Sequence, residues 1–219
     1  MTCETSPADR GLLSAGGFAG ILFCGAAIYG IATRPGFDLQ RHAVSNLSLG
    51  EGGWTMVAAF IGSGLLVLLC ALGLSRVLKE GRGRRALPIL VGLYGLGLIL
   101  AGIFPAPACC GFPAGTPEDQ LPAMTPTAIV HSIAFMIAFT SLIIACFVAA
   151  RRLSGGASIF SLLAGIFMPL LVGLGMSSAV APGVAFFVAA IIGWVWLAAL
   201  AMTVGGETAA SEPALATQA

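Results

Sequence analysis

Six long apolar runs constrain the fold of this chain more than any other feature of its sequence. A helix needs about 20 apolar residues to cross a hydrocarbon core of about 30 Å. Six runs approach or exceed this length, and they cover approximately residues 12–33, 54–78, 87–104, 127–150, 158–178 and 182–204. Strands of a membrane barrel would be about 10 residues long and would alternate polar with apolar residues, which these runs do not do. The sequence therefore predicts an all-α integral membrane protein, a bundle of six transmembrane helices.

Charge is scarce in this chain, and its distribution excludes or disfavours several functional classes. Only 9% of the residues are charged and the net charge is +1, so there is no broad basic surface for nucleic acid. Proton pumps and ion-coupled transporters place ionisable groups at the middle of the membrane, and none of the six runs has one there. We expect membrane lipids as the surroundings and no nucleic-acid partner. Ion-coupled transport is disfavoured.

The Lys and Arg residues of the connections predict how the chain is threaded, because cationic loops stay on the cytoplasmic side. The cations of the second and fourth connections are Arg76, Lys79, Arg82, Arg84, Arg85, Arg151 and Arg152. The third and fifth connections have none, and the first has only Arg34 and Arg41. We therefore expect a multi-pass protein of the cytoplasmic membrane with both termini inside and the first and third connections outside.

The ends of the chain differ in composition from the spans. Residues 1–11 and 205–219 are mostly small or polar and show no periodicity, so we expect two disordered cytoplasmic tails flanking a transmembrane domain at 12–204. Within the first span, Gly16 and Gly20 lie four residues apart, a spacing that lets two helix backbones approach closely. This spacing predicts a compact bundle, but it does not indicate an oligomeric state.

One short connection, residues 38–54, collects an unusual number of polar groups for so apolar a chain. We expect Asp38 to cap a short amphipathic helix that lies along the outer membrane surface and ends at Gly50, with Trp54 anchored at the level of the headgroups. Its polar side would carry Arg41, His42, Ser45, Asn46 and Ser48. This side would form one wall of an outward-facing polar pocket.

The third connection and the start of the fourth span bring further polar groups to the same side of the membrane. His131 lies about one turn into the fourth helix if Thr127 opens it, about 6 Å below the helix start. His42 and His131 would then share the outer leaflet and could converge, with Cys109, Cys110, Glu118 and Asp119 nearby. We predict Arg41, His42, Ser45, Asn46 and His131 as the residues that bind a ligand in this pocket.

Three chemical functions compete with a purely structural role for these groups. Asp38, His42 and Ser45 would share one helix face as in a serine hydrolase, but triads draw their members from separate elements and no oxyanion donor is apparent. A metal site could use His42, His131 and some of Cys109, Cys110, Glu118 and Asp119, although no HxxxH or CxxC spacing is present. A haem held between the two histidines has no further signature. The structural alternative is that these side chains satisfy loop backbone groups and cap helix ends.

The cysteines divide into two groups. Cys24, Cys70 and Cys146 lie within spans, where cysteine behaves as a small apolar packing residue. Cys109 and Cys110 are adjacent in the third connection, and joining neighbours would make a strained ring. Two free thiols, bonds to other chains and a vicinal disulfide therefore all remain open for this pair.

The polar segments also carry a family resemblance over nearly the whole chain. The stretch GFDLQRHAVSNLSLGEGGWTMVAAF (36–60), followed by GIFPAPACCGFPAGTP (102–117) and then His131, resembles the bacterial membrane-protein family called domain of unknown function 998. The matching positions are Arg41, His42, Ser45, Leu47, Ser48, Leu49, Gly50, Trp54, Phe104, Gly111, Pro113, Gly115, Pro117 and His131. The resemblance implies a six-span integral membrane protein without an established activity. Relatives often carry an aspartate where this chain has Ala106 and Pro107, which weakens the metal and hydrolase hypotheses.

Together these features favour a binding protein over an enzyme. We expect the chain to bind or move a small or lipid-like molecule through the outward-facing pocket, without a cofactor and without covalent chemistry of its own. The main alternative is an outward-facing membrane enzyme, or a metal or haem protein, centred on His42 and His131. A structural or assembly role beside another membrane protein is the third hypothesis.

Overall fold

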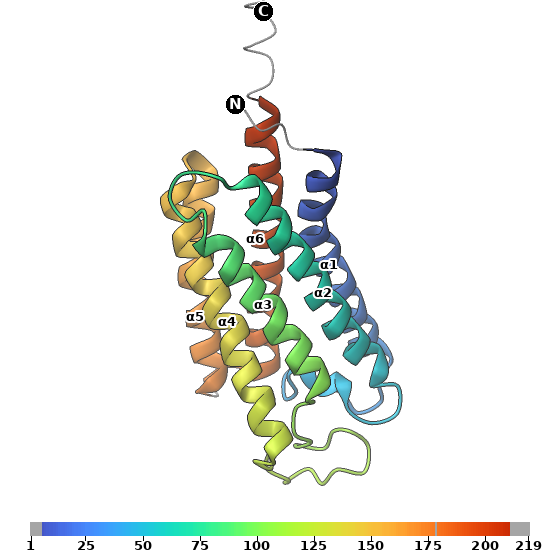
Figure 1. The fold of residues 1–219 in the computed structure, drawn as a ribbon. Helices are drawn as coiled ribbons and strands as arrows, with labels where there is room; N and C mark the ends of the chain where they lie inside the picture. Colours follow the sequence, from blue (N-terminus) through green and yellow to red (C-terminus); the bar gives the residue numbers. More distant parts are fainter. Residues whose placement is uncertain (1–5, 178, 211–219) are drawn as a thin grey trace, which may run out of the picture.

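Six long helices account for most of the chain in the computed structural model, which describes residues 6–177 and 179–210 (Figure 1). The elements are α1 (Pro7–Thr33), the 3-10 helix η1 (Val44–Ser48), α2 (Trp54–Val77), α3 (Ala86–Ile103), α4 (Pro126–Arg152), α5 (Gly155–Met176) and α6 (Pro182–Ala210). All six α-helices are long and apolar enough to span a membrane. The predicted fold class, an all-α bundle of six membrane-spanning helices, is confirmed over the described residues.

The helix boundaries follow local capping chemistry, and they extend further than expected at both ends of the chain. Ser6 accepts a hydrogen bond from the Asp9 N–H at 3.1 Å, and Pro7 occupies the first turn, so α1 begins before residue 12. At the other end α6 continues to Ala210. The prediction of tails at 1–11 and 205–219 is therefore wrong for residues 7–11 and 205–210, which are helical. Residues 1–5 and 211–219 of the predicted tails lie outside the described residues.

The helices form a closed ring in chain order. Each packs mainly on its neighbours along the chain, and α6 returns to pack on α1. Figure 1 shows the start of α1 and the end of α6 at one end of the bundle, together with the α2–α3 connection. We call this the basic end, because residues 76–85 and 151–152 gather their cations here. The opposite end, formed by the connections 34–53 and 104–125, is called the loop end.

Close contact between helices depends on small residues, as the sequence predicted. A Cβ atom added at Gly64 on α2 would lie 2.7 Å from the Gly95 carbonyl oxygen on α3. On α1, Gly16 faces side chains of both α2 and α6, and Gly20 faces α6. These glycines allow backbones to approach where any larger residue would force them apart.

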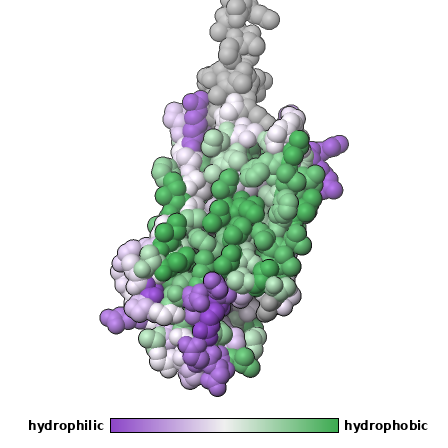
Figure 2. All heavy atoms as spheres, turned by 180° about the vertical axis from the view of Figure 1, so that it is seen from behind, coloured by the Kyte–Doolittle hydropathy of each residue, from purple (hydrophilic) through white to green (hydrophobic). Residues whose placement is uncertain are grey.

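The surface is divided into an apolar belt and two polar ends. Figure 2 shows hydrophobic residues covering the middle of the molecule, with hydrophilic residues gathered toward the two ends. At the basic end Arg152 donates hydrogen bonds to the carbonyls of Glu80 and Arg82, at 2.8 and 3.0 Å. This distribution is what a hydrocarbon layer requires of a spanning protein, because exposed polar groups are costly there.

Candidate functional site

The first connection folds differently from the amphipathic helix predicted for it. The Asp38 carboxylate accepts from the Gln40 N–H at 2.8 Å, and the Asp38 carbonyl accepts from the backbone N–H groups of Arg41 and His42. Asp38 therefore stabilises a turn, and helical structure begins only at Val44. The predicted helix starting at Asp38 along the membrane surface is wrong. Three of the side chains assigned to its polar face, those of Arg41, His42 and Asn46, contact the third connection instead.

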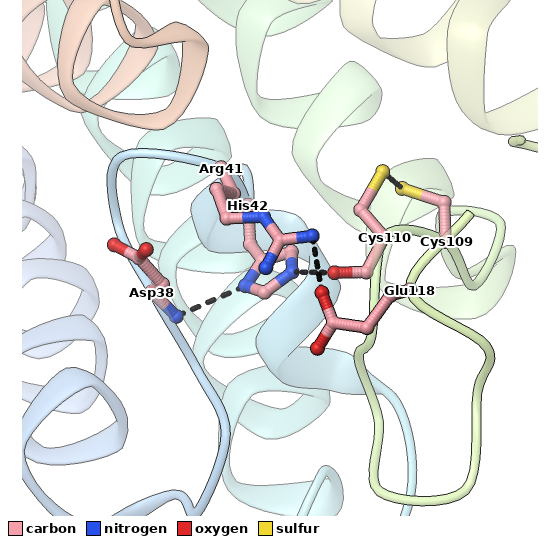
Figure 3. A network of polar contacts seen from close by, with 6 residues as sticks. All are labelled: Asp38, Arg41, His42, Cys109, Cys110 and Glu118. Atoms are coloured by element: carbon pink, nitrogen blue, oxygen red, sulfur yellow. Dashed lines mark hydrogen bonds and ion pairs between the residues drawn. The ribbon is translucent and has the colours of Figure 1, made fainter. Parts of the chain in front are cut away.

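His42 is the clearest example, since both of its ring nitrogens are bonded and the side chain is 2% exposed. Nδ1 accepts from the Asp38 N–H at 2.9 Å, and Nε2 lies 3.0 Å from the carbonyl oxygen of Cys110 (Figure 3). A carbonyl only accepts, so the proton of the neutral ring sits on Nε2. The ring packs between Phe37 and Phe112, with centroids 5.5 and 5.4 Å away. His42 therefore has no lone pair left for a metal or a haem iron.

Two further contacts join the first and third connections. Asn46 donates from Nδ2 to the Pro107 carbonyl at 3.0 Å. Arg41 pairs with Glu118 at 2.6 Å, and this hydrogen bond and charge raise the pKa of Arg41. We call these two contacts, together with the bond from His42 to Cys110, the loop clasp. Figure 3 shows His42 and Arg41 from the first connection reaching Cys110 and Glu118 of the third.

Arg34 organises the first connection from within. Its guanidinium donates to the carbonyls of Leu47 and Leu49, at the end of η1, and lies 5.4 Å from the centroid of the Phe112 ring. Sequence reasoning used Arg34 only as a loop cation. Its position directly after α1 was the available signal, because a cation there can reach carbonyls at the nearby end of another helix.

A cavity of about 370 Å³ lies inside the helix ring and reaches up to the clasp. All six α-helices contribute to its walls, as do residues 43–46 of the first connection and residues 106, 107, 109 and 122 of the third. It extends inward to Trp194, about 18 Å along α6 from Pro182 at 1.5 Å per residue. Most of the lining side chains are apolar or aromatic. The expected polar pocket is therefore an apolar cavity with polar side chains concentrated at its loop end.

The inner wall of the cavity is aromatic. Trp194 lies between Phe23 and Tyr94, with ring centroids 5.4 and 5.3 Å away, and is 3% exposed. Its buried indole N–H has no hydrogen-bond partner among the residues that the structure describes, whereas Trp196, two residues further on, donates to the Ser161 hydroxyl at 3.0 Å. Sequence reasoning missed Tyr94 and Trp194, because an aromatic residue in an apolar span is ordinary by composition.

His131 occupies the cavity mouth. It lies on α4, is 8% exposed, and its Nδ1 is 2.7 Å from the Phe104 carbonyl at the end of α3. The Ala101 carbonyl lies near the same ring. Ser45 and Asn46 line the cavity beside it. Three of the five predicted binding residues therefore line one cavity.

The other two predicted binding residues have different surroundings. His42 is not among the lining side chains, and Arg41 is on the surface, paired with Glu118. The two histidines share one end of the bundle but do not share a hollow, so the expectation that they converge on one pocket is wrong. The reason is that the third connection folds over His42 and bonds Nε2 through the Cys110 carbonyl, while Nδ1 is bonded to the Asp38 N–H of the first connection.

The groups considered for catalysis or metal binding are not assembled by the fold. No three His, Cys, Asp or Glu residues gather as a metal site within the described ranges. The Asp38, His42, Ser45 helix face does not form, and His42 contacts the backbone N–H of Asp38 rather than its carboxylate.

The adjacent cysteines of the third connection carry free thiols, and Cys110 donates to the Cys109 sulfur at 2.7 Å (Figure 3). Cys109 is buried and lines the cavity, whereas Cys110 is half-buried. Burial raises the pKa of the Cys109 thiol to about 12, and the hydrogen bond with Cys110 adds to the effect. Cys109 is therefore a protonated, unreactive thiol at neutral pH.

Fold and site together define a class, a six-span helical membrane protein whose two long connections close one end over an apolar cavity. The chain belongs to a family described as "Protein of unknown function (DUF998)", whose model matches residues 18–203. This confirms the family resemblance of the polar segments. No curated protein and no solved structure matches the chain.

Proposed function

We propose that this protein binds a small, lipid-like molecule in the cavity within its helix ring. The observation that carries the proposal is an apolar cavity of about 370 Å³ whose few polar side chains are concentrated at one end. Ligand sites are typically concave and mostly apolar, with a few polar groups that fix orientation. A ligand with one polar end and an apolar body matches this division.

The size of the cavity narrows the class of ligand. Since a water-sized group occupies about 30 Å³, a cavity of 370 Å³ holds about 12 such groups. That is one alkyl or isoprenoid chain of moderate length. A phospholipid with two full acyl chains is too large to enter completely.

We place the loop end on the extracytoplasmic side of the cytoplasmic membrane. The support for this orientation is the positive-inside rule, because the basic end carries the cations of residues 76–85 and 151–152. The ligand then meets Ser45, Asn46 and His131 at the outer mouth. Its chain points inward, toward Tyr94 and Trp194.

The position of Trp194 supplies a direct test of binding. Variants that retain Trp194 as the sole tryptophan, with Trp54 and Trp196 replaced by Phe, are placed in lipid nanodiscs and titrated with dodecanol brominated at its terminal carbon. Bromine quenches indole fluorescence only at short range, so a chain inside the cavity gives saturable quenching. Quenching that rises without saturation, as dissolved probe in the bilayer would cause, contradicts the proposal.

Two substitutions on α6 sharpen this experiment. Ala190 lines the cavity, and Ala190→Phe fills part of it, so saturable quenching should be lost. Val195 lies on the same helix and is 55% exposed, facing away from the cavity, so Val195→Phe adds the same ring outside the site. In Val195→Phe the probe should quench the fluorescence of Trp194 as it does in the parent protein. Equal behaviour of the two variants would place the probe outside the cavity.

A further inference from the structure

We infer that the ligand of the cavity presents a hydrogen-bond donor, such as the hydroxyl group of a single-chain alcohol, to Nε2 of His131. This inference rests on the proposed function and names the chemistry of the ligand's polar end. It follows from the hydrogen-bond partners that two buried side chains at the mouth already have.

The tautomer of His131 is set by the end of α3. Nδ1 lies 2.7 Å from the Phe104 carbonyl oxygen, which only accepts, so Nδ1 carries the proton of the neutral ring. Nε2 is then a lone-pair acceptor. The other described group near the ring is the Ala101 carbonyl, which is also an acceptor, so no described residue donates a hydrogen bond to Nε2, although His131 is 8% exposed.

His131 and its open nitrogen are placed for a ligand. The side chain lines the cavity, and Nε2 is not one of the described polar atoms that are fully enclosed by the protein without a hydrogen bond. A ligand group at the mouth can therefore reach it. A buried acceptor without a partner is costly, and a donor brought in by the ligand removes that cost.

Asn46 offers a second acceptor at the same mouth. It is 6% exposed and lines the cavity, and its amide nitrogen is already bonded to the Pro107 carbonyl at 3.0 Å. Its amide oxygen has no partner among the described residues. A hydroxyl group can donate to one of these two acceptors and accept from the remaining amide hydrogen of Asn46.

The walls of the cavity argue against an anionic headgroup. None of the lining residues, all of which are described, is Lys or Arg. Of the two arginines of the first connection, Arg41 is exposed and paired with Glu118, and Arg34 is bonded to the carbonyls of Leu47 and Leu49. A carboxylate or phosphate at the mouth would be desolvated without a cation, whereas a hydroxyl group carries no such cost.

The two histidines of the chain allow a measurement that needs no substitution. Nitrogen-15 spectra of histidine-labelled protein in nanodiscs should show two neutral rings with opposite tautomers, His42 protonated at Nε2 and His131 at Nδ1. Adding dodecanol should shift only the unprotonated nitrogen of His131, since His42 has both nitrogens bonded. A His131 ring protonated at Nε2, or a spectrum unchanged at saturating probe, overturns the inference.

Chain-matched probes test the same point by affinity. In competition with the brominated probe, dodecanol should bind with about tenfold higher affinity than dodecyl methyl ether. The ether has no donor, so one hydrogen bond is lost. His131→Phe should remove this preference while the ether still binds. His131→Gln, which retains both a donor and an acceptor, should keep part of the preference.

The outcomes separate this inference from the proposed function. If alcohol and ether bind equally well to the parent protein, the donor inference fails and the cavity remains a binding site. Tighter binding of dodecanoate than of dodecanol would also overturn it, because a protonated His131 would then recognise an anion. If no probe gives saturable quenching, the proposed function itself fails. Should His131→Phe not fold, the nitrogen-15 spectra of the parent still decide.

Discussion

His42 and His131 lie at the same end of the helix ring, yet their surroundings differ in one chemical respect. His42 is clamped between a backbone N–H and a carbonyl, so both ring nitrogens are used. His131 uses only Nδ1, at the end of α3, and its other nitrogen is left at the mouth of a cavity. The first histidine joins two connections, and the second retains a free acceptor.

This difference shows how burial alone fails to identify a binding residue. Both side chains are more than nine-tenths buried, at 2% and 8% exposure. A buried polar group with every bond satisfied stabilises one arrangement of the chain, whereas one with an open bond next to a cavity is suited to recognition. Substitutions in the clasp should therefore lower the free energy of unfolding, whereas substitutions at the cavity mouth should weaken ligand binding.

The largest expected effect concerns Cys109, which lies between the clasp and the cavity. Because the pKa of its thiol is raised to about 12, almost none is thiolate at pH 8, and alkylation by a maleimide should be about a thousandfold slower than in denatured protein. The rate should rise about tenfold per pH unit from pH 8 to 10. Mass spectrometry of the loop peptide at each pH measures it.

Cys110 provides the internal control for this experiment. It is half-buried and adjacent, so it should be alkylated before Cys109 in the folded protein. Denaturation should bring the two rates together. A Cys109 rate that levels off near pH 9 in the folded protein would mean that the third connection is open to water around this thiol.

A substitution of Gly183, at the start of α6, tests how closely the first connection packs on this helix. A Cβ atom at this position would overlap the carbonyl oxygens of Leu39 and His42. Gly183→Ala should therefore lower the free energy of unfolding in detergent by about 3 kcal/mol, because backbone atoms cannot move aside as a flexible side chain can. Gly173 on α5 has no atom of the described part of the chain within 4 Å of an added Cβ, so Gly173→Ala is the matched control. Equal effects of both substitutions would contradict the packing of the first connection on α6.

Replacing each histidine by alanine tests the comparison directly. His42→Ala removes two hydrogen bonds and the packing between Phe37 and Phe112, and should cost about 2 kcal/mol of stability. His131→Ala removes one hydrogen bond and should cost about 1 kcal/mol. Chemical unfolding in detergent measures both. If His131→Ala is the more destabilising, His131 is chiefly the cap of α3 and the division of roles is wrong.

The helical frame was predictable because its cause is local. Hydrocarbon sets the length of each apolar run, so α2 could be placed from Trp54 and α6 from Pro182, and both begin there. Errors arose where capping extended a helix beyond its apolar run, as at Pro7. Those residues are polar, and hydropathy does not register the hydrogen bond at Ser6.

The site was only partly predictable, because its contacts are distant in sequence. His42 and Cys110 are 68 residues apart, and Asn46 and Pro107 are 61 apart. A helical pattern read within the first connection could not include these partners, so it assigned His42 and Asn46 together to the polar side of a surface helix. The aromatic inner wall was missed for a related reason. Its rings come from α1, α3 and α6, and no single span shows that Tyr94 faces Trp194.

The smallest expected effect belongs to the most conspicuous contact of the clasp, the ion pair between Arg41 and Glu118. Arg41 is on the surface, so water and salt screen the pair, and Arg41→Gln should leave the unfolding transition unchanged within error. Arg34 is the matched comparison, because Arg34→Gln removes hydrogen bonds to two backbone carbonyls in a half-buried position and should cost about 1 kcal/mol. A larger loss for Arg41→Gln, diminishing at high salt, would show that charge rather than backbone bonding joins the two connections.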